Sequence, residues 1–169
     1  MDRRHRVRIG HRAPDFTCDA VVQGVIEGTA LPSRHLTSPS HQATEVSLET
    51  YIDPTAETPK WLILLFIPAA FSFVCPTEVL AFQNCLDEFR ERNCDVVFIS
   101  VDSKHSLWHW QNVPRQYGGL GQLDISLLSD AKHRMSLDYG VLLEEEGVCL
   151  RGMFIIDGQG IVQQVSLSS

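Results

Sequence analysis

The sequence predicts an α/β domain built on a mixed central sheet that is flanked by helices. Two observations indicate this fold class. Beyond Trp61, apolar segments of strand length alternate with segments whose apolar residues recur at helical spacing. The last two apolar segments flank Gly158-Gln159-Gly160, which is typical of a hairpin. A chain of 169 residues with 44% hydrophobic content is long enough for one domain with a substantial core.

The first 60 residues carry weaker signals than the rest of the chain. The segment 1–12 is basic and not apolar, so we expect a solvated tail, with a short mitochondrial presequence as the weaker alternative. Ser, Thr, Pro and His dominate residues 28–45, which cannot bury enough apolar surface to become ordered. We therefore expect a single domain over residues 1–169 with a flexible insertion at about 28–45.

Two segments beyond Trp61 define the predicted core. WLILLFI, residues 61–67, is a continuous apolar run, as expected for a strand that is buried on both faces. Residues 76–92 are expected to form one helix, with Glu78 complementing the positive end of its dipole. The apolar residues at helical spacing are Val79, Phe82, Leu86 and Phe89.

The remaining elements follow in the same alternating order. We expect strands at 95–101 and 125–130, and helices at 106–117 and 131–140. Pro114 is expected to stop the first of these helices and Gly140 to end the second. The segments 152–157 and 161–167 are the two strands of the terminal hairpin.

Charge and cysteine usage exclude several classes of function. A net charge of −7 argues against a surface that binds nucleic acid or anionic membranes. The longest apolar run is broken by Pro68 and is too short to span a bilayer. The five cysteines are widely spaced, with no CxxC, which argues against a zinc ribbon and a thioredoxin-type dithiol. An odd number of cysteines favours a reducing compartment, so we expect a cytoplasmic protein.

Cys75 is the strongest candidate for a reactive residue. It lies where a predicted strand ends and a predicted helix begins, and there the unpaired N–H groups and the helix dipole lower the pKa of a thiol. Ser72 offers a hydroxyl three residues earlier, and Pro68 restricts the backbone and the access of solvent. The residues alone leave a second interpretation open, because unpaired cysteines are often ordinary core residues.

The segment around Cys75 also resembles a known signature. PAAFSFVCPTE is similar to the peroxiredoxin active-site pattern Pro-x-x-x-Thr/Ser-x-x-Cys, filled here by Pro68, Ser72 and Cys75. FVCPTE resembles the typical two-cysteine, or thioredoxin peroxidase, branch of that family. Four further segments resemble this branch in the same order: FISVDS, GGLG, DYGVLLEEEG and LRGMFIIDGQG. The resemblance covers about residues 7–27 and 46–167.

The resemblance implies a thioredoxin-like fold and a thiol-dependent peroxidase that reduces hydrogen peroxide and organic hydroperoxides. Cys75 would attack the peroxide and become a sulfenic acid, while Arg151 would lower the pKa of the thiol and bind peroxide oxygens. Ser72 would supply an oriented donor and Pro68 would shield the product. Glu78 and Tyr139 fall on positions that support the site. No metal or organic cofactor is implied, and the pair His105 and His109 has no obvious third ligand.

The resemblance also implies partners, and among the departures from the family pattern one concerns the resolving cysteine. The implied partners are a peroxide substrate, thioredoxin or another thiol reductant, and further copies of the chain in a homodimer or a higher homo-oligomer. Typical two-cysteine members carry a resolving cysteine beyond a final helix, and we expect this chain to lack both. An external thiol would then reduce the sulfenic acid. The alternative function is that of a truncated or non-catalytic paralogue that acts as a chaperone-like or redox-signalling binding protein.

Overall fold

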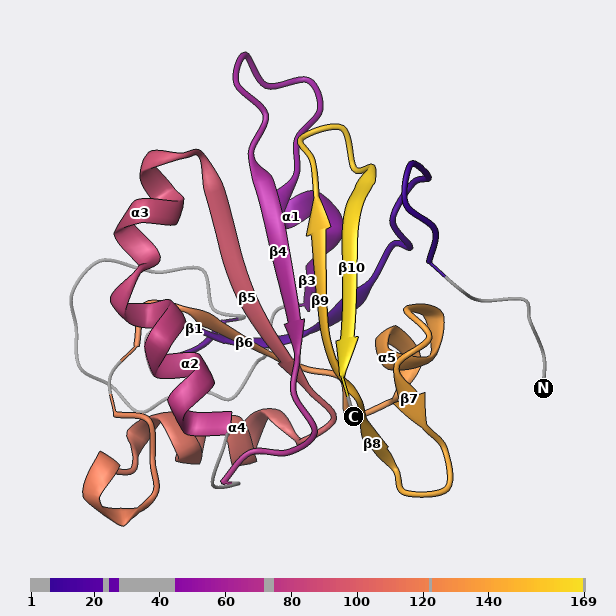
Figure 1. Ribbon diagram of the computed structural model, residues 1–169. Coiled ribbons are helices and arrows are strands. Elements are labelled where there is room, and N and C mark those ends of the chain that lie inside the picture. Colours follow the sequence, from indigo (N-terminus) through magenta and orange to yellow (C-terminus); the bar gives the residue numbers. More distant parts are fainter. Residues whose placement is uncertain (1–6, 23–24, 28–44, 72–74, 122, 169) are drawn as a thin grey trace.

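The computed structural model describes residues 7–22, 25–27, 45–71, 75–121 and 123–168 (Figure 1). The expected mixed sheet is confirmed, and helices lie on both of its faces. Most of the expected insertion, residues 28–44, lies outside the described residues.

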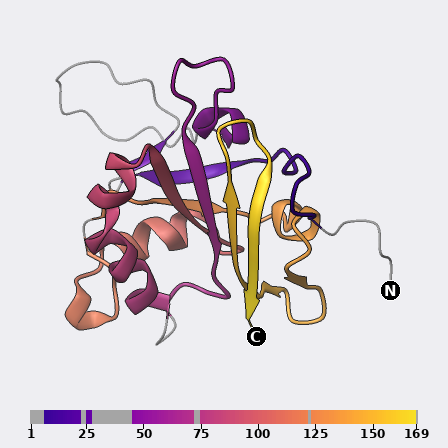
Figure 2. The same ribbon diagram turned by 45° about the horizontal axis from the view of Figure 1, so that its top comes forward.

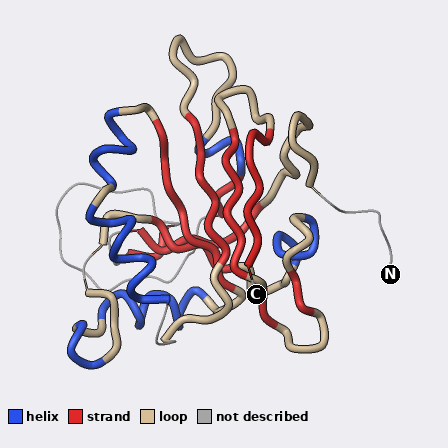
Figure 3. Tube along the Cα trace, viewed as in Figure 1, coloured by secondary structure: helices blue, strands red, loops and turns tan. Residues whose placement is uncertain are grey.

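The sheet has the strand order β10-β9-β4-β5-β6-β1-β2, and β3 pairs with β1. Figure 3 shows the strands in red. Strands β4, β5 and β6 are parallel, whereas β9, β10 and β1 run antiparallel to their neighbours. β4 is therefore an interior strand that is paired on both sides. The strands of this sheet are β1 (Thr17–Val22), β2 (Val25–Glu27), β3 (Glu45–Ser47), β4 (Trp61–Phe66), β5 (Cys94–Ser100), β6 (Ser126–Ser129), β9 (Arg151–Ile156) and β10 (Val162–Ser168). A separate small hairpin joins β7 (Leu142–Leu143) to β8 (Val148–Cys149).

The helices cover both faces of the sheet (Figures 1 and 2). They are α1 (Leu48–Tyr51), α2 (Cys75–Asn84), α3 (Leu86–Glu91), α4 (Lys104–Asn112) and α5 (Arg134–Asp138), with a 3₁₀ turn at Arg115–Tyr117. Val79, Leu86 and Trp110, from α2, α3 and α4, belong to one buried cluster. Leu48 and Met135, from α1 and α5, belong to the cluster on the opposite face. Each face of the sheet therefore has its own apolar core.

The continuous apolar run at 61–67 follows from the position of β4 between two apolar clusters. Leu62, Leu64 and Phe66 enter the cluster on the α1 and α5 side. Ile63 and Ile67 enter the cluster on the α2 to α4 side. Because alternate residues point to opposite faces, a strand with helices on both sides needs apolar residues at successive positions. Its first residue, Trp61, lies at the end of the strand and is exposed.

One expectation about the elements was wrong, and strand β1 was missed. The single helix expected over 76–92 is two helices, because Cys85 has φ −102° and ψ 6° and donates its N–H to the Phe82 carbonyl at 3.1 Å, three residues back. This bond replaces an α-helical one and interrupts the ladder. Strand β1 was not predicted, although it lies inside the sheet between β6 and β2. Its residues, TCDAVV, are neither continuously apolar nor strictly alternating, so they carry little strand signal.

The structure contains, over its described residues, no helix that is both long and apolar enough to cross a membrane.

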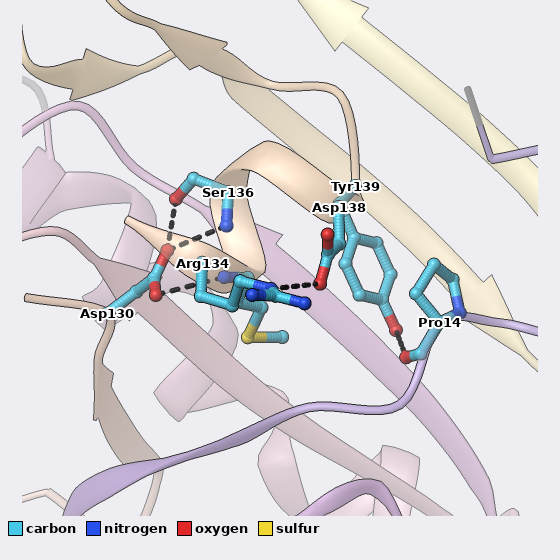
Figure 4. A network of polar contacts seen from close by, with 7 residues as sticks. Pro14, Asp130, Arg134, Ser136, Asp138 and Tyr139 are labelled. Carbon is cyan, nitrogen blue, oxygen red and sulfur yellow. Dashed lines mark hydrogen bonds and ion pairs between the residues drawn. The ribbon is translucent and has the colours of Figure 1, made fainter. Parts of the chain in front are cut away.

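A buried carboxylate fixes the start of α5 (Figure 4). Asp130 is 3% exposed, and its Oδ1 accepts a hydrogen bond from the Met135 N–H at 3.0 Å. Its Oδ2 accepts from both the N–H and the hydroxyl of Ser136, each at 2.6 Å. Asp130 thus satisfies two N–H groups that have no partner inside the short helix.

Replacing Asp130 should therefore destabilise the fold. The substitution Asp130→Ala leaves three buried donors without an acceptor, and we expect the free energy of unfolding to fall by roughly 3 kcal/mol. Urea denaturation at neutral pH measures this difference. The control is Asp138→Ala, which removes an ion pair to the largely exposed Arg134 side chain and should cost less than about 1 kcal/mol. Equal losses in the two variants would contradict this account of Asp130.

The buried thiol of Cys18 should make stability fall at alkaline pH. Burial, and then the nearby Asp130, Asp19 and Glu45 carboxylates, raises the pKa of Cys18 from 9.0 to about 12. As the pH rises above about 9, the unfolded chain loses this proton and the native state keeps it, so unfolding becomes more favourable.

The test is urea denaturation between about pH 8.5 and about pH 10.5. The free energy of unfolding of Cys18→Ala should fall less steeply over this range than that of the wild type. Cys85→Ala is the matched control, because Cys85 is exposed in the native state, and it should keep the wild-type slope. A Cys18→Ala slope equal to that of the wild type would refute the prediction.

Candidate active site

The chain is held firmly where β4 ends. Phe66 pairs with Gly152 of β9 on one side and with Ile99 of β5 on the other. Ile67 then donates its N–H to the Ile99 carbonyl at 2.9 Å, and its own carbonyl accepts from the buried Cys149 thiol at 2.9 Å. The half-buried Pro68 follows directly. The loop that leads to Cys75 therefore starts from a fixed point.

A second contact holds the middle of this loop. The Ala70 N–H donates to Oδ2 of Asp102 at 2.8 Å. The sequence interpretation did not single out Asp102. A signal was present, because a polar residue directly after the predicted strand 95–101 lies at the carboxyl edge of parallel strands, where functional groups collect in α/β sheets.

Cys75 is the first residue of α2. The sequence argument placed it at a helix start, and the backbone agrees with that placement. A helix start presents N–H groups without intrahelical partners, together with the positive end of the helix dipole. Ser72 lies outside the described residues, and only the backbone of Cys75 is described.

An ion pair fixes a cation beside this helix start. Arg151 donates its Nε–H to both carboxylate oxygens of Glu78, at 3.0 and 3.2 Å. Glu78 lies in the first turn of α2, three residues after Cys75. Arg151 begins β9, one residue before the Gly152 that pairs with Phe66. Two segments 73 residues apart in sequence therefore meet at the carboxyl end of β4.

Tyr139 lies on the other side of the sheet from α2. It is buried, and its hydroxyl donates to the Pro14 carbonyl at 2.9 Å (Figure 4). Its ring centroid lies 5.5 Å from that of Phe66 and 5.1 Å from that of Phe154. Burial raises the pKa of Tyr139 above its ordinary value, so the phenol stays neutral. Tyr139 therefore packs beneath the last residue of β4.

The predicted site residues thus fall into three groups. The structure brings Pro68, Glu78 and Arg151 together with the backbone of Cys75 around the end of β4. It places Tyr139 below this point in the core. The position of Ser72 stays a prediction.

The other cysteines have different surroundings. Burial raises the pKa of Cys18 to about 12 and that of Cys94 to about 11, so both thiols stay protonated at neutral pH. Cys149 is buried against the Ile67 carbonyl, whereas Cys85 is exposed. Neither Cys18 nor Cys94 supplies a thiolate, which is the nucleophilic form.

Within the part of the chain that the structure describes, no three His, Cys, Asp or Glu side chains are grouped in a way that would hold a metal ion. A cavity of about 440 Å³ is lined by residues that include Arg12, Ile52 and Gln159. It lies by the β9–β10 turn, at the opposite end of β9 from Arg151, and none of the predicted site residues lines it.

Comparison with known sequences gives a consistent family. Residues 9–165 match the model of the AhpC/TSA family. Peroxiredoxin TSA1 of Saccharomyces cerevisiae is 43% identical over 161 residues, which cover 95% of this chain and 70% of the relative. Peroxiredoxin-2 of Macaca fascicularis is 42% identical, with the same coverage of both chains. The thioredoxin peroxidase of Echinococcus granulosus is 39% identical over 160 residues, which cover 95% of this chain and 71% of the relative.

Comparison with solved structures agrees. The reduced 2-Cys peroxiredoxin of Plasmodium vivax superposes with a TM-score of 0.77 at 35% identity, over 95% of this chain and 72% of that structure. AhpC of Enterococcus faecalis gives a TM-score of 0.77 at 28% identity, over 96% of this chain and 82% of that structure. These neighbours confirm the thioredoxin-like fold of the peroxiredoxin type. The chain therefore belongs to the AhpC/TSA family and is a peroxiredoxin of the two-cysteine branch.

Proposed function

We propose that this peroxiredoxin reduces hydrogen peroxide and organic hydroperoxides through a sulfenic acid on Cys75, in antioxidant defence and redox homeostasis. One observation carries the proposal. The Arg151 guanidinium is paired with Glu78 in the first turn of the helix that starts at Cys75. Helix start and cation both favour negative charge, so both stabilise the thiolate and the charge that passes to peroxide oxygen.

The first step transfers two electrons from sulfur to the peroxide. The Cys75 thiolate attacks one oxygen, and an S–O bond forms as the O–O bond breaks. The other oxygen leaves as alkoxide or hydroxide and takes a proton from water, which gives an alcohol or water. Cys75 becomes the sulfenic acid. Arg151 would stabilise the departing oxygen, the Ser72 hydroxyl would orient the peroxide, and Pro68 would shield the product from solvent.

The second step needs a thiol. A thiol condenses with the sulfenic acid to give a disulfide and water, and a second thiol then releases Cys75. Three of the four described cysteines other than Cys75 are buried, which favours an external dithiol. Thioredoxin fits this requirement, and one relative of this chain is named a thioredoxin peroxidase.

Assembly and location complete the proposal. Strand β10 is an edge strand whose side chains are mostly exposed, so it offers an unpaired edge to a second copy. A homodimer or a higher homo-oligomer is the assembly that we propose. The cytoplasmic location expected from the cysteine usage stays a prediction.

Replacing Arg151 tests the proposal. We expect Arg151→Met to lower the second-order rate of hydrogen peroxide with the reduced protein about 100-fold, because the departing oxygen loses its cation. Glu78→Gln should lower this rate about 10-fold, because the guanidinium keeps its charge and loses its fixed position. Stopped-flow fluorescence with one equivalent of peroxide measures these rates.

Arg134→Met is the matched control, since Arg134 forms an exposed ion pair with Asp138 on α5. It should react at the wild-type rate. Equal rates for Arg151→Met and the wild type would remove the proposed role of Arg151. A wild-type rate no greater than that of free cysteine would instead favour the non-catalytic binding protein.

A further inference from the structure

Asp102 is attached to the loop that precedes Cys75. Its Oδ2 accepts a hydrogen bond from the Ala70 N–H at 2.8 Å and another from the Ser100 hydroxyl. Ala70 lies two residues after Pro68, and 32 residues separate it from Asp102. Through the Asp102 side chain, this contact joins the described part of the β4–α2 loop, at Ala70, to the end of the neighbouring strand β5.

Hydrogen bonds to its backbone also hold Asp102 in place. Its N–H donates to the Ser100 hydroxyl oxygen at 3.1 Å, and its carbonyl accepts from the Ser129 hydroxyl at 2.7 Å. Ser100 and Ser129 are the last residues of β5 and β6. The carboxylate therefore belongs to the rigid edge of the sheet, so it can fix the position of what it binds.

The residue after Ala70 shows that the loop is constrained. Phe71 has a φ of 57°, in the left-handed region that non-glycine residues rarely adopt. Such a conformation persists only where the surroundings hold it. The Phe71 ring centroid lies 6.0 Å from those of His109 and Trp110 on α4. The Asp102 bond on one side and these ring contacts on the other hold this turn.

We propose that Asp102 is a positioning residue for the reaction of Cys75 with peroxide. By holding Ala70, it fixes the described part of the loop, Pro68 to Phe71, which precedes Cys75 in the sequence. In-line attack on an O–O bond requires close alignment, and a small displacement costs much of the rate. This inference rests on the proposed function, because it assigns Asp102 a role in that same reaction.

The role depends on a hydrogen-bond acceptor and not on negative charge. Asparagine places a carbonyl oxygen where the carboxylate oxygen lies, so Asp102→Asn can still accept from Ala70. Alanine cannot. We expect Asp102→Ala to lower the second-order rate with hydrogen peroxide at least about 10-fold, and Asp102→Asn to stay within about threefold of the wild type. Asp95→Asn is the matched control, because Asp95 pairs with Lys60 at the other end of β5.

Two further readouts separate positioning from general damage to the fold. Alkylation of Cys75 by iodoacetamide needs a thiolate but no peroxide alignment, so its rate in Asp102→Ala should stay within about twofold of the wild type. Hydrogen exchange of the Ala70 amide should become faster in Asp102→Ala and stay slow in Asp102→Asn and Asp95→Asn. If Asp102→Ala does not fold, Ser100→Ala removes one donor to the same oxygen and should also speed Ala70 exchange and slow the peroxide reaction.

The inference is overturned if folded Asp102→Ala, or Ser100→Ala in its place, reacts with peroxide at the wild-type rate. It is also overturned if alkylation and the peroxide reaction slow equally, since that outcome reports a general loss of structure. A wild-type protein whose Cys75 reacts no faster than free cysteine would defeat the proposed function instead. Ala70 exchange would then still decide whether Asp102 anchors the loop.

Discussion

The structure depends on the pairing of strand β4 with a neighbour on each side. β5 pairs with it in parallel and β9 in antiparallel orientation along its length, so the carboxyl end of β4 cannot shift. Parallel pairing also brings the ends of β5 and β6 to the same edge. The loop to α2, Asp102 after β5, and Arg151 at the start of β9 all meet there. The register of one strand therefore sets the geometry of the candidate site.

In this arrangement, the residues that support the end of β4 and the candidate reactive residues lie on opposite faces of the sheet. On one face, Tyr139 packs against Phe66 beneath the end of β4, while Asp130 holds the start of α5, the helix that directly precedes Tyr139. On the other face, α2 carries Cys75 and Glu78 and rests on its own apolar cluster. Buried apolar contacts thus fix the backbone. A few hydrogen bonds and one ion pair at the carboxyl end of β4 fix the positions of the charged side chains. A reaction that moves charge from sulfur to oxygen needs such preorganised groups.

Local sequence predicted the elements whose signal is continuous or periodic. The run at 61–67 and the strand at 95–101 were confirmed because most of their residues are apolar. The terminal hairpin was confirmed because Gly158-Gln159-Gly160 separates its two strands. Strand β1 was not predicted, because its six residues alternate only partly between apolar and polar and so carry little strand signal. The break at Cys85 was not predicted, because the helical spacing of the apolar residues continues across it. The helix start at Cys75 followed from local residues. The contacts Arg151–Glu78 and Ala70–Asp102 join residues 73 and 32 apart, and only the strand register decides them.

In the proposed function one cysteine, Cys75, is set apart by its place in the fold and reacts with peroxide. The direct measurement treats the reduced protein with one equivalent of hydrogen peroxide, adds dimedone to trap sulfenic acid, and locates the adduct by peptide mass spectrometry. We expect an adduct on Cys75 and none on Cys85, although Cys85 is exposed. An adduct on Cys85 that equals or exceeds the one on Cys75 would contradict this expectation, because exposure and not the helix start and Arg151 would then control reactivity.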